Sequence, residues 1–153
     1  MNMKVTRRIV AIALLSMSTF FALGAAAEEE ATAPSLYERL GGDEGLTKIL
    51  NDTIALHHKN PDIAHYFTNV DDDVLARHVI AFFAAGTGGP VNYQGRDMTT
   101  THASMDMSDA DYDSAVADVL KSVKANGVDA ESAAEVAAIL ESLRPAVMGT
   151  AES

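Results

Sequence analysis

Apolar residues recur every three or four positions in four long stretches of the chain, separated by polar residues. These stretches span residues 43–59, 71–83, 108–125 and 129–148. Such spacing places the apolar side chains on one face of an α-helix. No stretch shows a convincing period of two, which a half-buried strand would require. The pattern therefore predicts an all-α fold.

Short polar and glycine-containing segments mark the ends of these helices. Ser35 and Glu38 have the spacing of a capping box in front of a short helix at 36–40, which Gly41-Gly42 terminates. The glycine-rich segment 86–95 is predicted to be a loop. Residues 97–102 are expected to form a single helical turn or a loose segment.

The first 27 residues differ from the rest of the chain. A basic start is followed by an apolar run from Ile9 to Gly24 and by three alanines before Glu28. This pattern is typical of a secretory signal peptide, and the run is shorter than the roughly 20 residues of a spanning helix. We expect a signal peptide at 1–27, a disordered leader at 28–34 and one domain at 35–150, located in the periplasm or secreted. The adjacent Arg7 and Arg8 leave the export route open between general and twin-arginine secretion.

Charge and composition narrow the function. The net charge is −11, there is no cysteine, and the predicted signal peptide holds three of the eleven basic residues. An acidic domain of this kind is a poor partner for nucleic acid or, after cleavage, for an anionic membrane. Phosphate-loop, hydrolase and metalloprotease motifs are missing from the sequence. Whether the protein is an enzyme stays open, with redox chemistry on nitric oxide or peroxide as the class to consider.

Histidines and aromatic residues gather in the middle third of the chain. His78 lies one helical turn before Phe82, so its imidazole sits among apolar groups and needs a ligand or a hydrogen-bond partner. His102 lies on a segment expected to face that helix, from which both rings could approach a flat cofactor. The other histidines, His57, His58 and His65, are interpreted as structural or surface residues.

An ordered set of motifs resembles the group 1 truncated haemoglobins over residues 36–147. The motifs are Leu36-Tyr37-Glu38-Arg39-Leu40-Gly41-Gly42, Tyr66-Phe67, Phe82-Phe83, Gly88-Gly89-Pro90, Tyr93-x-Gly95-Arg96-x-Met98 and His102. The resemblance implies a shortened globin whose helices pack two on two around haem b. It also implies that His102 is the proximal iron ligand, that Phe67 packs on the haem face, and that Phe82 and Phe83 line the pocket, with Met98 among the cofactor-binding residues.

The distal side departs from the common pattern of that family. Many members carry a tyrosine and a glutamine that point at bound oxygen, and the matching positions here are Ile54 and Val79. Leu75 matches another distal position. Without hydrogen-bond donors, bound oxygen should dissociate or oxidise the iron more readily. Tight oxygen storage and oxygen-dependent removal of nitric oxide are therefore not expected.

His78 matches a histidine that binds the iron opposite the proximal ligand in cyanobacterial members of the family. Ligation by two histidines would suit electron transfer. The alternative is that His78 reaches a haem propionate or solvent. Arg77, Tyr93 and Arg96 are candidates for contacts to the haem propionates, because in so acidic a chain the two carboxylates need nearby hydrogen-bond donors.

Two tasks remain for such a haem protein: electron transfer with a redox partner protein, or binding of a diatomic gas such as oxygen or nitric oxide. A periplasmic carrier of copper or another metal is an alternative, because Met98, His102, Met105 and Met107 offer ligands that suit Cu(I). A haem carrier or a sensor subunit is a third hypothesis. The oligomeric state stays open.

Overall fold

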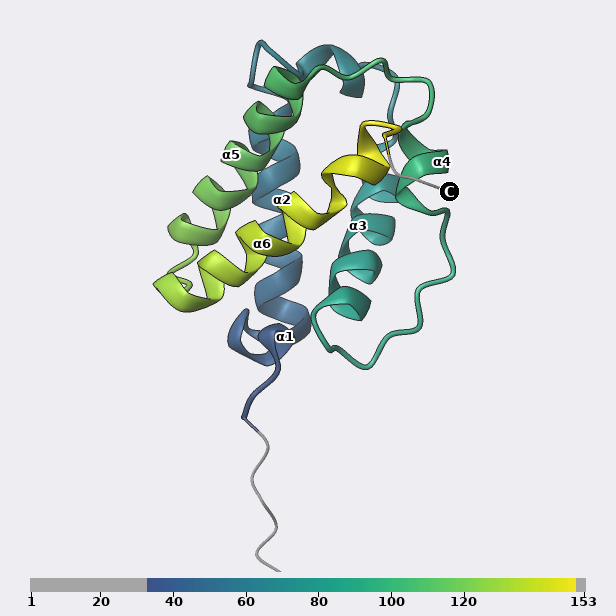
Figure 1. The fold of residues 1–153 in the computed structure, drawn as a ribbon. Coiled ribbons are helices and arrows are strands. Elements are labelled where there is room, and N and C mark those ends of the chain that lie inside the picture. Colours follow the sequence, from purple (N-terminus) through teal and green to yellow (C-terminus); the bar gives the residue numbers. More distant parts are fainter. Residues whose placement is uncertain (1–32, 151–153) are drawn as a thin grey trace, which may run out of the picture. The chain divides into compact units, whose positions relative to one another are not determined.

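The computed structural model describes residues 33–150, which fold into helices and connecting loops without any strand in that range (Figure 1). The elements are α1 (Leu36–Arg39), α2 (Gly42–His57), the 3-10 helix η1 (Ala64–Phe67), α3 (Asp72–Gly86), α4 (Met98–His102), α5 (Asp109–Ala125) and α6 (Ala130–Val147). The all-α prediction is confirmed. The predicted signal peptide at 1–27 and the leader up to residue 32 lie outside the described residues.

Local side-chain hydrogen bonds fix where the helices begin. Ser35 and Glu38 form the predicted capping box of α1, and Ser108 forms a second one with Asp111 at the start of α5. Gly41 follows α1 with φ at 93°, a left-handed conformation that glycine adopts without steric cost. The chain can therefore turn at once from α1 into α2.

The four long helices form two layered pairs around a shared core. Helix α2 contacts both α3 and α5, and α6 packs against α5 and α4. Leu46 and Leu50 of α2, Val123 of α5 and Val136 of α6 are all at most 2% exposed. Burying side chains of this size contributes roughly 1.5–3 kcal/mol each. The core holds α2, α5 and α6 together. Helix α3 packs against α2.

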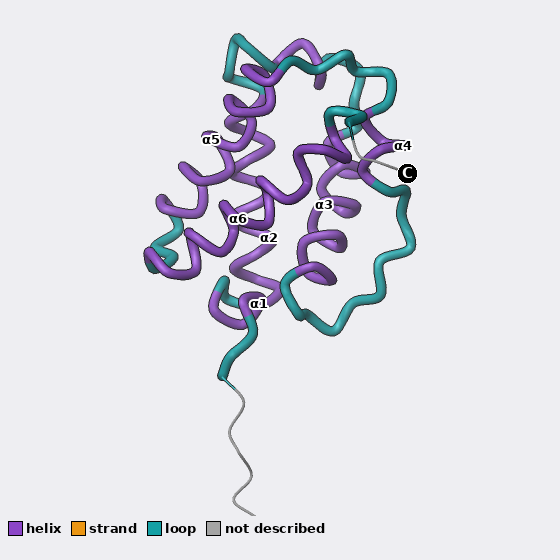
Figure 2. The backbone as a smooth tube through the Cα atoms, viewed as in Figure 1, coloured by secondary structure: helices purple, strands orange, loops and turns teal. Residues whose placement is uncertain are grey.

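A long loop without helix joins α3 to α4, as Figure 2 shows. It begins at Thr87, whose carbonyl accepts a hydrogen bond of 2.9 Å from the backbone N–H of Tyr37. This bond ties the start of the loop to α1. The loop ends at Asp97, which caps α4 by accepting a hydrogen bond from the backbone N–H of Thr100.

Helix bounds follow the sequence pattern closely, with small differences. Helix α2 starts at Gly42, one residue before the predicted start, and ends at His57, ahead of Asn60-Pro61. The segment at 97–102 was predicted to be either a helical turn or a loose segment, and it is helical from Met98. Helix α6 continues through Pro145 to Val147. None of the helices in residues 33–150 has the length and apolar character of a membrane span.

Candidate functional site

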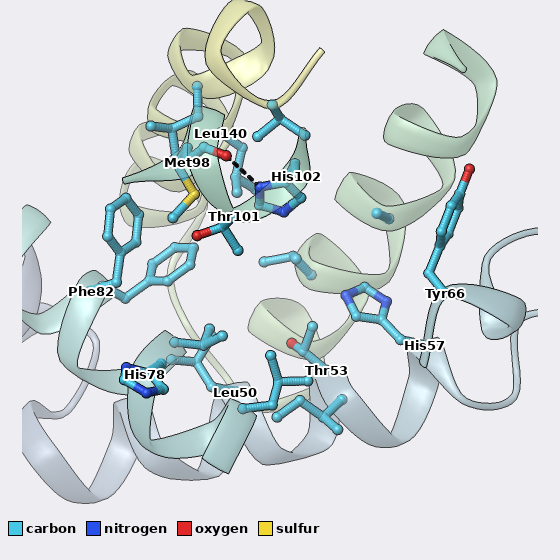
Figure 3. A pocket seen from close by; sticks show the side chains of 18 of the residues that line it. Leu50, Thr53, His57, Tyr66, His78, Phe82, Met98, Thr101, His102 and Leu140 are labelled. Atoms are coloured by element: carbon cyan, nitrogen blue, oxygen red, sulfur yellow. Dashed lines mark hydrogen bonds between the residues drawn. The ribbon is translucent and has the colours of Figure 1, made fainter. Parts of the chain in front are cut away.

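A largely apolar cavity opens between α2, α3, α4, α5 and α6 (Figure 3). The space between protein atoms is about 1310 Å³, part of it open to solvent. Nine of the eleven site residues predicted from the sequence line this cavity: Phe67, Leu75, His78, Val79, Phe82, Phe83, Tyr93, Met98 and His102. The fold thus brings together residues that are spread over 36 positions of the chain.

His102 is held by the short helix α4. Its Nδ1 lies 2.8 Å from the backbone carbonyl oxygen of Met98 (Figure 3). A carbonyl can only accept a hydrogen bond, so Nδ1 carries the proton and donates it. The lone pair of the imidazole is then on Nε2, the nitrogen available for a metal ion. The Met98 carbonyl therefore orients the His102 ring so that Nε2 is the nitrogen available to a metal ion.

Aromatic rings form one wall of the cavity. The ring of Phe82 packs edge-on against Phe83, with centroids 6.0 Å apart, and against Tyr93, with centroids 5.3 Å apart. The Tyr93 hydroxyl donates a hydrogen bond of 3.1 Å to the carbonyl oxygen of Arg96. A Cβ atom at Gly95 would lie 2.1 Å from that hydroxyl, so only glycine leaves room for the ring. This arrangement fixes Tyr93 and Phe82 relative to each other.

The charged residues predicted for the propionates lie away from the cavity lining. Arg77 on α3 and Arg96 in the loop are both exposed, and neither lines the cavity. Tyr93 does line it. That the two arginines contact the haem propionates at the edge of the cavity stays a prediction. His78 is exposed as well, but it is one of the α3 residues that line the cavity.

His57, interpreted from the sequence as a structural or surface residue, also lines the cavity. Its side chain is only 12% exposed, and its Nδ1 lies 3.2 Å from a carboxylate oxygen of Asp118 on α5. The His57 ring stacks on Phe67 with centroids 5.2 Å apart and an interplanar angle of 23°. Burial lowers the pKa of His57 below its usual 6.5, although the Asp118 carboxylate acts to raise it. His57 is therefore a neutral imidazole near pH 7.

Sequence reasoning could not have found this pair. Asp118 lies 61 positions from His57 and belongs to a different helix. Two adjacent histidines on one helix face different directions, and nothing in the chain says which one is buried. Only the packing of α2 against α5 brings the imidazole and the carboxylate together.

The donor chemistry of the cavity fits haem better than a metal ion held by protein ligands alone. No cluster of three or more histidine, cysteine, aspartate or glutamate residues suited to a metal occurs in the part of the chain that the structure describes. The cavity instead combines apolar walls with the imidazole of His102, whose Nδ1 is bonded to the Met98 carbonyl. The methionines of the copper hypothesis, Met98, Met105 and Met107, line the same cavity. Haem is a flat, largely apolar group, and these walls and the imidazole of His102 would hold it.

Comparison with known proteins places the chain among globins. Residues 35–149 match the family model described as bacterial-like globin. The group 1 truncated haemoglobin of Tetrahymena pyriformis is 26% identical over 119 residues, which cover 75% of this chain and 95% of that protein.

Solved structures show the same fold. The Fe(III) form of the truncated haemoglobin from Tetrahymena pyriformis superposes with a TM-score of 0.73 at 24% identity, covering 75% of this chain and 98% of that one. The 2/2 haemoglobin of a Synechococcus strain, solved with covalently attached haem, gives a TM-score of 0.71 at 21% identity, covering 76% and 99%. The predicted two-on-two globin fold is confirmed.

Globins hold haem iron through a proximal histidine, and the family match confirms haem as the predicted cofactor. The family match does not favour the alternative function as a carrier of copper or another metal. From the match over residues 35–149, the chain belongs to the bacterial-like globins, and the curated relatives that it resembles are named group 1 truncated haemoglobins.

Proposed function

We propose that this protein binds haem b in the cavity through Nε2 of His102 and uses it to bind a diatomic gas or to transfer electrons. One observation carries the proposal: the Met98 carbonyl accepts the Nδ1 proton of His102 at 2.8 Å. That hydrogen bond fixes the tautomer and the ring orientation that an axial ligand needs. When bound, haem supplies an iron atom that coordinates small gases such as oxygen or nitric oxide.

The walls of the cavity support haem by packing and by excluding water. Phe82, Phe83 and Tyr93 offer flat apolar surface beside α4. Leu75 and Val79 of α3 and Ile54 of α2 line the side away from α4 and carry no hydrogen-bond donor. A bound gas would receive little stabilisation of negative charge from these three residues. The site therefore suits rapid exchange of a ligand or electron transfer better than oxygen storage.

We further propose that His78 is the second axial ligand in the resting protein. His78 lines the cavity from α3, whereas His102 does so from α4. His78 is exposed on α3, and a rotation of its side chain would bring the imidazole toward the cavity. Ligation by two neutral imidazoles changes little when iron changes oxidation state, which favours electron transfer with a redox partner protein.

The absorption spectrum of the haem-reconstituted chain tests this ligation. We expect low-spin bands in both the ferric and ferrous forms, and slow binding of carbon monoxide. The variant His78→Ala should keep haem, show high-spin bands and bind carbon monoxide faster. His58→Gln is the matched control, because His58 lies outside the cavity and pairs with Asp72 at 2.8 Å. High-spin bands in the wild-type protein would show that His78 does not ligate the iron and would leave gas binding as the function.

The location of the protein is a separate proposal that rests on the first 27 residues. The basic, apolar and small-residue segments in that order support export to the periplasm or the medium. Cell fractionation followed by N-terminal sequencing should find a mature chain that starts at Glu28. A cytoplasmic protein that keeps Met1 would contradict it.

A further inference from the structure

A second imidazole in the cavity, that of His57, is held in a fixed orientation, and the proposed function does not use it. His57 projects from α2 into the cavity with one ring nitrogen facing its interior (Figure 3). The other nitrogen, Nδ1, faces the Asp118 carboxylate at 3.2 Å. A carboxylate accepts hydrogen bonds, so Nδ1 carries the proton and Nε2 keeps its lone pair. The group that faces the cavity is therefore a proton acceptor.

Asp118 is itself held in place, so the orientation of the pair is fixed. The side-chain amide of Asn60 donates a hydrogen bond of 2.8 Å to the same carboxylate oxygen that His57 contacts. Asn60 also donates to the hydroxyl of Ser114 at 3.0 Å. Ser114 in turn donates to the carboxylate of Asp62 at 3.3 Å. This set of contacts ties the end of α2 to α5 and leads from the cavity wall to the exposed Asp62.

We propose that His57 is the proton-accepting residue of the cavity for small weak acids, written H–X, that bind as their conjugate bases. Hydrogen sulfide, hydrogen peroxide and hydrogen cyanide belong to this chemical class. The inference rests on the proposed function, because the anion X⁻ would be held in the haem cavity. It goes beyond that function because it assigns the site a further class of ligand and a residue that selects it.

The step is a simple proton transfer. The H–X bond breaks, its electron pair stays on X, and a new N–H bond forms at Nε2 of His57. The anion remains in the cavity, and the imidazolium is stabilised by the Asp118 carboxylate 3.2 Å from Nδ1. No oxidation or reduction takes place. A neutral gas such as carbon monoxide has no proton to give and gains nothing from His57.

The surroundings of His57 suit this role near neutral pH. The titratable groups that face it are Asp118 from α5 and His58 from its own helix, and Tyr66 of η1 lies on the same cavity wall. Burial lowers the pKa of His57 below 6.5. The imidazole is thus neutral, and able to accept a proton, from that lower pKa upward.

Cyanide binding to the ferric, haem-reconstituted chain tests the role of His57. The variants His57→Gln and Asp118→Asn should bind cyanide more slowly by about 10²-fold, the usual size of a single acid–base contribution. Carbon monoxide binding to their ferrous forms should stay at the wild-type rate. The matched controls are His58→Gln and Asp72→Asn, which alter a similar pair outside the cavity. Cyanide rates equal to wild type in both His57→Gln and Asp118→Asn would overturn the proposal.

A haem-independent measurement keeps the proposal testable if a variant does not fold. Nitrogen-15 NMR of the histidine rings in the wild-type chain should find His57 protonated on Nδ1, and a proton on Nε2 would overturn the assignment. The two proposals fail in different ways. A wild-type chain that takes up no haem contradicts the proposed function, whereas normal haem uptake with unchanged cyanide rates contradicts only the role of His57.

Discussion

Three histidines border the cavity, and the partner of each ring decides what that ring can do. His102 donates to a backbone carbonyl and offers Nε2 to a metal. His57 faces a carboxylate and offers Nε2 to a proton. His78 is exposed at the cavity edge, where it can turn between solvent and a ligand position. The three histidines can thus take different roles because their rings face a carbonyl, a carboxylate and solvent, respectively.

The buried His57 should make the stability of the fold depend on pH. Its pKa is lowered in the folded protein by burial, so the unfolded chain binds more protons once the pH falls below 6.5. Stability is then full above pH 6.5 and decreases as the pH falls through the window down to the lowered pKa. Thermal unfolding of the haem-free wild-type chain should show this decrease.

The variant His57→Gln isolates that contribution. In this variant the melting temperature should change less between pH 7 and the acid end of the window, and His58→Gln should behave as the wild type does. An equal pH dependence in all three proteins would show that His57 does not titrate in this way.

Gly95 is expected to be essential for the position of Tyr93. The substitution Gly95→Ala places a Cβ 2.1 Å from the Tyr93 hydroxyl, so the ring must move away from Phe82. We expect a loss of about 1–3 kcal/mol in unfolding free energy, typical of overpacking, and weaker haem binding. Urea denaturation and haem titration measure the two effects.

Gly86→Ala provides the control, because a Cβ there would meet no atom within 4 Å. It should be neutral, or stabilising by about 0.4–1 kcal/mol. If Gly95→Ala behaved like Gly86→Ala, Tyr93 would not be fixed by the space that Gly95 leaves.

Most of the site residues expected from the resemblance line the cavity, and tertiary packing determines where the others lie. Phe67, Phe82 and His102 could be identified because short motifs around them are distinctive. His57 was missed because its burial depends on Asp118 in a distant helix. Arg77 and Arg96 were chosen for their charge alone, and charge does not say whether a long side chain turns toward a cavity or toward solvent.

At the level of elements, capping residues determine where the helices that build the site begin. The capping box of Ser108 and Asp111 starts α5, which carries Asp118. Replacing Ser108 with alanine removes the acceptor for the Asp111 backbone N–H, a hydrogen bond of 3.2 Å. We expect Ser108→Ala to lower the free energy of unfolding by about 0.5–2 kcal/mol, measured by urea denaturation.

Ser142→Ala is the matched control for that substitution. Ser142 is exposed within α6 and bonds only to a carbonyl of its own helix among the described contacts. Its change should stay within about 0.5 kcal/mol of wild type. Equal effects at the two serines would contradict the capping role of Ser108.

The long helices could be predicted from the sequence because the spacing of their apolar residues and their capping residues indicate the same helix bounds. Helix α4 could not be settled, since five residues carry too little periodicity to separate a helix from a loose turn. Its structure depends on the Asp97 cap and on packing against α6. The conformation of α4, which carries the proposed iron ligand His102, is thus poorly determined by its own residues.

In the described domain as a whole, the packed core and the cavity adjoin one another, and Leu50 and Leu140 belong to both. Leu46, Val123 and Val136 form a dense core of α2, α5 and α6. The cavity lies where α3 and α4 meet those helices, and its lining side chains are mostly only partly buried. A ligand that fills this space only in the folded protein stabilises it by mass action. Haem binding should therefore raise the stability of the whole domain.

The central claim is that haem is held through Nε2 of His102. The measurement that tests it most directly is a haem titration of the wild-type chain and of His102→Ala, followed by absorbance, with and without added imidazole. We predict that His102→Ala loses most of its haem affinity and its wild-type spectrum, and that imidazole restores both by filling the space of the missing ring. Haem uptake and a spectrum equal to wild type in His102→Ala, without imidazole, would contradict the account.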